Sequence, residues 1–141
     1  MTTSNVHRIV WLSAGAVLCI DQLTKFAGTS NFGGVFEPVG NPDYSLGVVT
    51  APTVTLIALS AVTLIAAALY GIGLARAGRV PAWIPGVILG GAASNLADRV
   101  TIGEVRDFIP TSIAIFNVAD VAVLGGVIAF MWCMTSRACS T

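Results

Sequence analysis

The chain has 141 residues, of which 55% are hydrophobic and 10% are charged, and its mean hydropathy is +0.86. A soluble domain usually carries about a quarter charged residues, so the composition excludes an ordinary globular protein and indicates one membrane-embedded domain over residues 1–141. The formal net charge is zero, so total charge gives no indication of a nucleic-acid partner.

The first apolar segment runs from about residue 9 to residue 26. A secretory signal peptide is the competing interpretation, but it would end at a small-residue cleavage site. This segment instead runs into Asp21 and Lys25, so we predict a retained transmembrane helix. The spacing of these two residues also suits an ion pair at the membrane surface, although Asp21 lies deeper in the segment than such a pair requires.

Residues 28–50 are polar and rich in glycine and proline. No helix tolerates that density of breakers, so we expect an external loop with short extended pieces at 35–36 and 46–49. Its polar centre, Asn-Pro-Asp-Tyr-Ser-Leu-Gly, begins at Asn41. Taken alone, this centre is explained equally well as a turn without a function.

Three further apolar segments predict transmembrane helices over about residues 52–75, 82–100 and 117–134. The third of the four spans contains glycines that allow a neighbouring helix to approach closely, namely Gly86, Gly90 and Gly91. Near its end, one helical face carries residues spaced i, i+3 and i+4, namely Asn95, Asp98 and Arg99.

Four spans place both ends of the chain on one side of the membrane, and the charge pattern indicates which side. The ends and the turn between spans two and three carry only basic residues, namely Arg8, Arg76, Arg79 and Arg137. All acids fall on the other side, namely Asp21, Glu37, Asp43, Asp98, Glu104, Asp107 and Asp120. Because cytoplasmic loops are enriched in Lys and Arg, we expect both termini in the cytoplasm. The predicted fold is an all-α polytopic membrane protein whose four transmembrane helices carry a small extracytoplasmic β-like loop platform.

Histidine and cysteine are placed unfavourably for metal chemistry. The single histidine, His7, lies on the inner side, away from the acids. Zinc is therefore disfavoured, as is a serine or cysteine nucleophile activated by histidine. The cysteines at 19, 133 and 139 show no metal-ligand spacing, and we interpret them as small buried hydrophobic residues. We expect neither a metal nor a cofactor.

Polar residues from separate spans converge at the outer membrane face, namely Asp21, Lys25, Asn95, Asp98, Arg99, Asp107, Asn117 and Asp120. Structural roles compete with functional ones here. Asn117 or Asp120 could cap the last helix, because a carboxylate is favourable at a helix N-terminus. Asp98 beside Arg99 could form a structural ion pair, which we favour for those two residues.

Asp107 and Asp120 are less easily explained as structural. Asp107 precedes an apolar turn, and Asp120 lies one turn inside an apolar helix. If the two carboxylates meet, one shared proton supplies a base and an acid in one place. The ionised member activates water and the protonated member donates a hydrogen bond to the carbonyl under attack. This is the chemistry of an aspartic peptidase.

Four ordered sequence boxes make the interpretation specific. They are Asp-Gln-Leu-Thr-Lys at 21–25, Asn-Leu-Ala-Asp-Arg at 95–99, Gly-Glu-Val-Arg-Asp-Phe at 103–108 and Phe-Asn-Val-Ala-Asp at 116–120. Together with four spans and cytoplasmic ends, these boxes resemble the bacterial lipoprotein signal peptidases (signal peptidase II). The resemblance covers essentially the whole chain.

The resemblance implies a function and a set of residue roles. Asp107 and Asp120 would be the catalytic dyad of an endopeptidase in the bacterial cytoplasmic (inner) membrane, with its active site at the extracytoplasmic face. It would cut diacylglyceryl-modified prolipoproteins on the amino side of the lipidated cysteine, among membrane lipids. Side chains lining the substrate cleft would be Asn41, Asn95, Arg99 and Asn117. Structural support would come from Asp21, Lys25 and Asp98.

Two features depart from the family pattern. Asp43 stands where the family's first-loop box usually has glycine, and only twelve residues separate Asp107 from Asp120. Both departures bear on the substrate range rather than on the chemistry. Two other functions use the same buried acids. A small transporter is disfavoured because the acids cluster at one face, and a non-catalytic lipopeptide-binding relative is disfavoured because both aspartates are retained.

Overall fold

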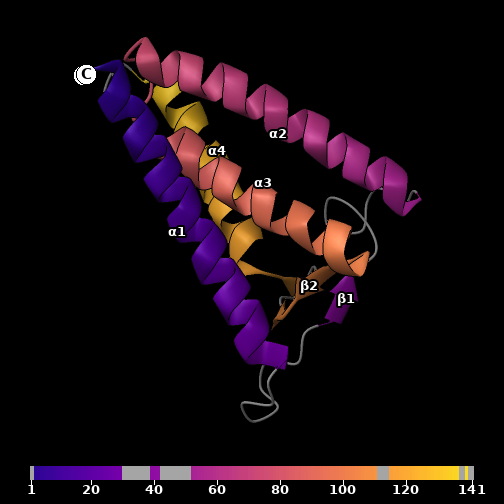
Figure 1. Cartoon of the computed structure of the whole chain (residues 1–141). Coiled ribbons are helices and arrows are strands. Elements are labelled where there is room, and N and C mark those ends of the chain that lie inside the picture. The colour runs from indigo at the N-terminus through magenta and orange to yellow at the C-terminus, as the bar shows by residue number, and fades with distance from the viewer. Residues whose placement is uncertain (1, 30–38, 42–51, 111–114, 137–138, 140–141) are drawn as a thin grey trace.

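We describe the fold from a computed structural model that covers residues 2–29, 39–41, 52–110, 115–136 and 139. The expected extended pieces at 35–36 and 46–49 lie outside these residues. Four helices form at the four predicted spans and extend them by a few residues, namely α1 (Thr3–Thr29), α2 (Thr53–Arg76), α3 (Trp83–Ile102) and α4 (Val118–Thr135) (Figure 1).

Three of these helices, α1, α2 and α4, are long and apolar enough to cross a membrane. Their outward faces are apolar, and on α2, for example, Val54 is 78% exposed and Leu69 is 75% exposed. Apolar surface on that scale indicates contact with lipid rather than water. Helix α3 is less apolar because it carries the polar groups near its end, and it lies among the other three helices.

The start of α1 and the end of α4 lie at the same end of the molecule. One core cluster joins the start of α1, the end of α2, the start of α3 and the end of α4, through Val6, Ala75, Ala82 and Cys133. From this end α2 leans along α3 and diverges from α1 (Figure 1). The result is an up-and-down helical arrangement in which α3 contacts every other helix.

The glycines of α3 allow the close helix packing that was predicted. A Cβ atom added to Gly86 or Gly90 would collide with the backbone of α1. A Cβ atom on Gly91 would lie 2.6 Å from the carbonyl oxygen of Ala119 on α4. These contacts bring the polar end of α3 against the ends of α1 and α4 that carry the other candidate residues.

Short strands form a small platform at the polar end of the bundle. Strand β1 (Val39–Asn41) pairs antiparallel with β2 (Val105–Asp107), and β3 (Ile109–Pro110) pairs with β4 (Ile115–Phe116). Gly103 ends α3 in a left-handed conformation, with φ of 84°, so the chain can reverse into β2. The β1–β2 register places Val39 opposite Asp107 and Asn41 opposite Val105.

The cysteines are not all buried hydrophobic residues, and the prediction was wrong on this point. Cys133 and Cys139 form a disulfide, which ties residue 139 to the last turns of α4. Cys19 is free and exposed on α1.

The contact between α3 and α4 can be tested at Gly91. We expect Gly91→Ala to lower the free energy of unfolding by about 1–3 kcal/mol, because the added methyl group meets the backbone of α4. Thermal unfolding of the protein in detergent measures this loss. The matched control is Gly125→Ala on α4, where an added Cβ meets nothing within 4 Å. Equal melting temperatures for the two variants would contradict the packing of α3 against α4.

Candidate active site

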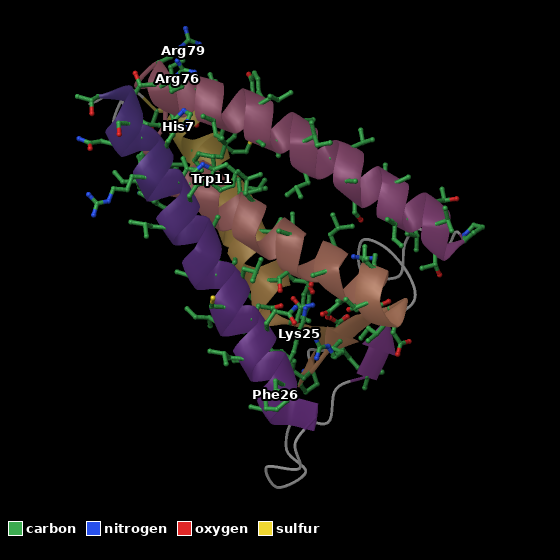
Figure 2. The ribbon with its side chains drawn as sticks, viewed as in Figure 1. His7, Trp11, Lys25, Phe26, Arg76 and Arg79 are labelled. Carbon is green, nitrogen blue, oxygen red and sulfur yellow. A yellow bond between two sulfur atoms is a disulfide. The ribbon has the colours of Figure 1, made fainter. Side chains whose placement is uncertain are left out.

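The ammonium group of Lys25 is completely buried between α1 and α3 (Figure 2). Its Nζ lies 2.6 Å from Asp21 Oδ2 and 3.0 Å from Asp98 Oδ2, and it donates to Asn95 Oδ1 at 2.9 Å. Asp21 is also completely buried. The Asp21–Lys25 pair is therefore not a surface ion pair, and its two charges depend on each other for stability inside the protein.

Asp21 also holds the start of α4. Its Oδ1 accepts a hydrogen bond from the backbone N–H of Ala119 at 2.7 Å, and its Oδ2 accepts one from Ser94 Oγ at 2.7 Å. The first N–H groups of a helix have no partner within the helix, and a negative charge there is favourable. One carboxylate on α1 thus fixes α3 and α4 relative to each other.

Asp98 pairs with Lys25 and with Arg106, whose Nη2 lies 2.7 Å from Asp98 Oδ1. Gln22 also donates to Asp98, at 3.0 Å, and accepts from Arg106 at 2.9 Å. The sequence favoured a pair between Asp98 and Arg99, and this was wrong about the partners. Consecutive residues of a helix project about 100° apart, so Asp98 faces α1 and the β platform.

Asn117 caps α4 and also bridges the two candidate catalytic residues. Its Oδ1 accepts from the backbone N–H of Asp120 at 2.8 Å, and Asp120 Oδ2 accepts from the backbone N–H of Asn117 at 3.3 Å. This is a capping box. The Nδ2 group of Asn117 then donates to Asp107 Oδ1 at 2.6 Å and to Asn95 Oδ1 at 3.1 Å.

Asp107 and Asp120 are therefore brought together around one asparagine. A second asparagine holds each carboxylate: Asn41 donates to Asp107 Oδ2 at 2.8 Å, and Asn95 donates to Asp120 Oδ1 at 2.7 Å. Asp107 is only 2% exposed, whereas Asp120 is partly buried. Water can thus reach the pair from the Asp120 side.

Burial raises the pKa of the Asp107 carboxyl above its ordinary value. The hydrogen bond from Asn41 opposes the shift, and the nearby charge of Asp120 adds to it. Like charges close together disfavour double ionisation. The electrostatics at Asp107 therefore favour one proton held by the pair of carboxyl groups over two ionised carboxylates.

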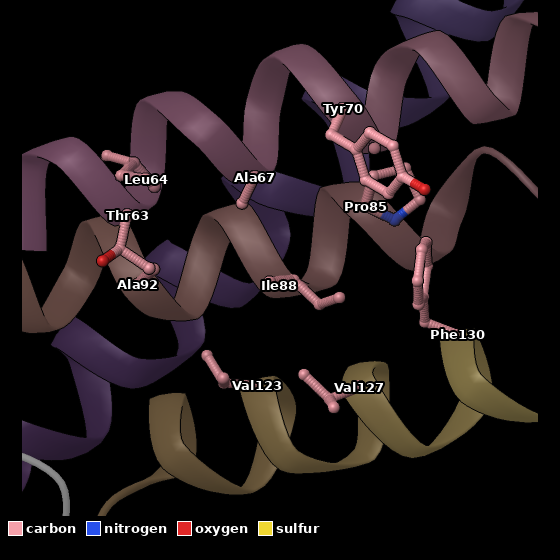
Figure 3. A pocket seen from close by; sticks show the side chains of 11 residues that line it. Thr63, Leu64, Ala67, Tyr70, Pro85, Ile88, Ala92, Val123, Val127 and Phe130 are labelled. Atoms are coloured by element: carbon pink, nitrogen blue, oxygen red, sulfur yellow. The ribbon is translucent and has the colours of Figure 1, made fainter.

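An apolar groove of about 300 Å³ begins one turn below the polar cluster, between α2, α3 and α4 (Figure 3). At its near end lie Ala92, three residues from Asn95, and Val123, three residues from Asp120. At its far end Tyr70 and Phe130 face each other with ring centroids 6.4 Å apart. The groove can hold an apolar chain next to the two aspartates.

The structure places every predicted site residue at one end of the bundle and links most of them by hydrogen bonds. Arg99 is buried at the end of α3, where its Nη1 donates to the Asn95 carbonyl oxygen at 3.5 Å. Sequence reasoning missed three residues that hold this network, namely Gln22, Ser94 and Arg106. Each is a direct neighbour of a predicted site residue, which is the one sequence feature that could have identified them.

Fold and site together define a class of protein, a helical membrane protein whose polar end brings two aspartates together around one asparagine. Comparison with known proteins narrows the class. The sequence model of the family described as signal peptidase (SPase) II matches residues 13–136. The chain belongs to the signal peptidase II family, a family of aspartic peptidases.

Curated relatives agree with this family. The chain is 35% identical over 138 residues to a lipoprotein signal peptidase of Syntrophus aciditrophicus, with 83% of this chain and 86% of the relative covered. It is 35% identical over 142 residues to a lipoprotein signal peptidase of Moorella thermoacetica, with coverage of 86% and 89%. The protein is therefore an integral bacterial membrane enzyme of the kind that processes lipoproteins.

Two solved structures, both described as bacterial membrane enzymes, share the fold. One superposes with a TM-score of 0.76 at 24% identity, covering 92% of this chain and 90% of the other. The second gives a TM-score of 0.72 at 25% identity, covering 86% and 89%. Because the first of these structures is only 24% identical to this chain, its similarity supports the fold alone.

The buried ion-pair network can be tested at Lys25. We expect Lys25→Met to destabilise the protein by about 3–5 kcal/mol, because it leaves Asp21 and Asp98 with less compensated buried charge. Thermal unfolding in detergent and the yield of folded protein measure the loss. Arg8→Met, which removes an exposed charge from the same helix, should change stability by less than about 0.5 kcal/mol. Similar stability of the two variants would mean that the Lys25 ammonium is solvated.

Proposed function

We propose that this peptidase removes signal peptides from diacylglyceryl-modified prolipoproteins, cutting on the amino side of the lipidated cysteine, with Asp107 and Asp120 as its catalytic dyad. The observation that carries the assignment is the position of the two carboxylates around Asn117, which donates to one and caps the helix that bears the other. The family supplies the reaction class, and this geometry supplies the candidate reacting groups.

In the proposed mechanism the dyad shares one proton. The ionised carboxylate takes a proton from water, whose oxygen attacks the scissile carbonyl carbon, while the protonated carboxyl donates to the carbonyl oxygen. Collapse of the tetrahedral intermediate breaks the C–N bond and passes a proton to the amino group of the lipidated cysteine. The raised pKa of Asp107 supports a proton that is shared by the pair and is not assigned to either aspartate alone.

The asparagines around the dyad have two proposed roles. Asn41, Asn95 and Asn117 position the carboxylates, and they are close enough to contact a peptide lying across the two aspartates. Arg99 at the end of α3 is proposed as a further contact to the substrate at the edge of this cleft. Lys25, with its two carboxylate partners, supports the cleft without touching the substrate.

We propose the apolar groove as the binding site for part of the substrate's hydrocarbon. It begins one helical turn from the dyad at Ala92 and Val123 and extends toward Tyr70. An extended apolar chain leaving the scissile bond would enter it directly. Burial of that chain would supply binding energy remote from the reacting bond, which an enzyme can use to position that bond.

We further propose that α3 also spans the membrane, in addition to α1, α2 and α4, that both termini are cytoplasmic and that the dyad lies at the extracytoplasmic face. The arginine-rich end supports this orientation. The Cys133–Cys139 disulfide at the same end favours the opposite orientation, because disulfides are rare in the cytoplasm. The charge distribution outweighs this single bond, because it involves both ends of the chain and the turn between α2 and α3. A transporter remains the alternative function, and nothing in the described residues favours it.

Substitution of the dyad tests the catalytic assignment. Asp107→Asn and Asp120→Asn should each abolish cleavage of a lipidated prolipoprotein by the purified enzyme in detergent, followed by gel shift. Each variant should still accumulate in the membrane, because an amide nearly preserves the shape of the side chain. Near-normal turnover in either variant would remove that residue from the dyad.

Glu104→Gln is the matched control, since Glu104 is an acid in the same loop region that has no assigned catalytic role. It should retain activity within a few-fold. Excess EDTA should also leave the enzyme active, because the proposed dyad activates water without a metal, and the described residues bring together no group of three or more His, Cys, Asp or Glu side chains that could hold one. Loss of activity with EDTA that zinc or manganese restores would contradict the dyad mechanism.

The pH dependence of cleavage follows from the shared proton. Because the pKa of Asp107 is raised, Asp107 stays protonated above the pH at which an ordinary aspartate ionises, and activity should fall only when the pair loses this proton. Activity should also fall at low pH as the base becomes protonated, which gives a bell-shaped profile of kcat/KM. A profile that still rises far into the alkaline range, with the protein folded, would rule out the shared proton.

The same raised pKa predicts a stability effect of defined sign. The folded state holds the Asp107 proton more tightly than the unfolded chain, so this residue lowers stability as pH rises through its folded pKa. The effect is measured as the difference between wild type and Asp107→Asn in melting temperature across pH. Wild type should lose stability relative to the variant as pH rises.

Orientation can be tested by cysteine labelling in intact cells, starting from a variant without native cysteines. A cysteine at Val39, which is half-exposed on β1, should react with a membrane-impermeant thiol reagent. A cysteine at Ala77, exposed in the turn after α2, should react only after the membrane is permeabilised. The reverse pattern would overturn the proposed orientation.

A further inference from the structure

A second cavity lies at the end of the bundle opposite the aspartates. Its volume is about 270 Å³, and it lies between the start of α1 and the turn that joins α2 to α3. Its lining is apolar except for Arg76, and the apolar side chains are Val6, Ile9, Ala75, Val80, Pro81, Ala82 and Trp83. The proposed peptidase reaction makes no use of this cavity.

The surroundings of this cavity are basic. Arg76 lines it, and Arg79 follows three residues later, after the left-handed Gly78 ends the helix. His7, Arg76 and Arg79 gather where α1 begins and α2 ends (Figure 2). In the sequence no acid occurs in residues 1–20, 44–97 or 121–141. The arginines around the cavity therefore have no carboxylate from these segments to neutralise them.

We infer that this cavity binds the phosphate headgroup of an anionic phospholipid of the surrounding membrane. A guanidinium group offers planar, charged donors that match phosphate oxygens in pairs. Basic pockets between transmembrane helices are known to bind such headgroups. Trp83, which is 47% exposed beside the cavity, has the amphipathic ring typical of the headgroup level of a membrane.

A lipid fits the cavity better than free phosphate. Seven of the nine lining residues are apolar, and they offer nothing to a small inorganic anion but suit the glycerol and first methylene groups of a lipid. The cavity also lies at a helix end, beside the apolar outer face of α2, where Leu69 is 75% exposed. Acyl chains can therefore continue along the protein while the phosphate stays at Arg76.

The test compares lipid binding to purified full-length protein in detergent by native mass spectrometry. Phosphatidylglycerol should bind at least several-fold more tightly than phosphatidylcholine. Arg76→Gln should weaken phosphatidylglycerol binding about tenfold, as expected for the loss of one charged hydrogen-bonded contact. Arg76→Lys, which keeps the charge but not the paired donors, should give an intermediate loss.

Arg8→Gln is the matched control, because it removes one exposed charge at the same end without touching the cavity. It should change binding by no more than about twofold. Inorganic phosphate at millimolar concentration should neither raise the melting temperature nor displace the lipid. Equal losses for Arg8→Gln and Arg76→Gln, equal binding of the two lipids, or full displacement by phosphate would each overturn the proposal. Cleavage activity in detergent should be unchanged in Arg76→Gln, so this test is separate from that of the dyad.

Discussion

The structure depends first on the charge of Lys25. An ammonium group buried between membrane helices carries a desolvation cost of several kcal/mol unless carboxylates compensate it. Two carboxylates do so, Asp21 from its own helix and Asp98 from α3. Because Asp21 also accepts from the backbone of Ala119, this single buried charge sets how α1, α3 and α4 meet.

The same ammonium group orients the two proposed catalytic aspartates through two asparagine amides. Asn95 Oδ1 accepts from Lys25 and from Asn117, so its Nδ2 group is directed to Asp120. The Oδ1 of Asn117 accepts from the start of α4, so its Nδ2 group is directed to Asp107. An amide has one acceptor side and one donor side, and fixing one side fixes the other. Helix capping and placement of the dyad are therefore one arrangement, not competing roles for Asn117.

Much of this could be predicted from the sequence. Long apolar segments predicted the helices, most of whose ends are correct to within a few residues, and the glycines of the third span predicted its close packing against a neighbouring helix. The ion-pair partners of the buried charges were harder to predict, because Asp98 adjoins Arg99 in the sequence but faces Lys25 and Arg106 in space. Arg106 reaches Asp98 from β2, and β2 is paired with a three-residue strand, β1, that no sequence pattern indicated.

Polar side chains gather at one end of the bundle because water stabilises polar groups and lipid does not. Charged and hydrogen-bonding groups are costly at the middle of a bilayer and far less so near its surface. Peptide hydrolysis needs water and ionised groups, and the proposed catalytic aspartates meet this need at the end of α3 beneath the strands, where Asp120 remains partly exposed. The apolar groove leads from this place toward the membrane interior. A substrate anchored by hydrocarbon can therefore keep its anchor in an apolar environment while its peptide bond lies beside two polar carboxylates.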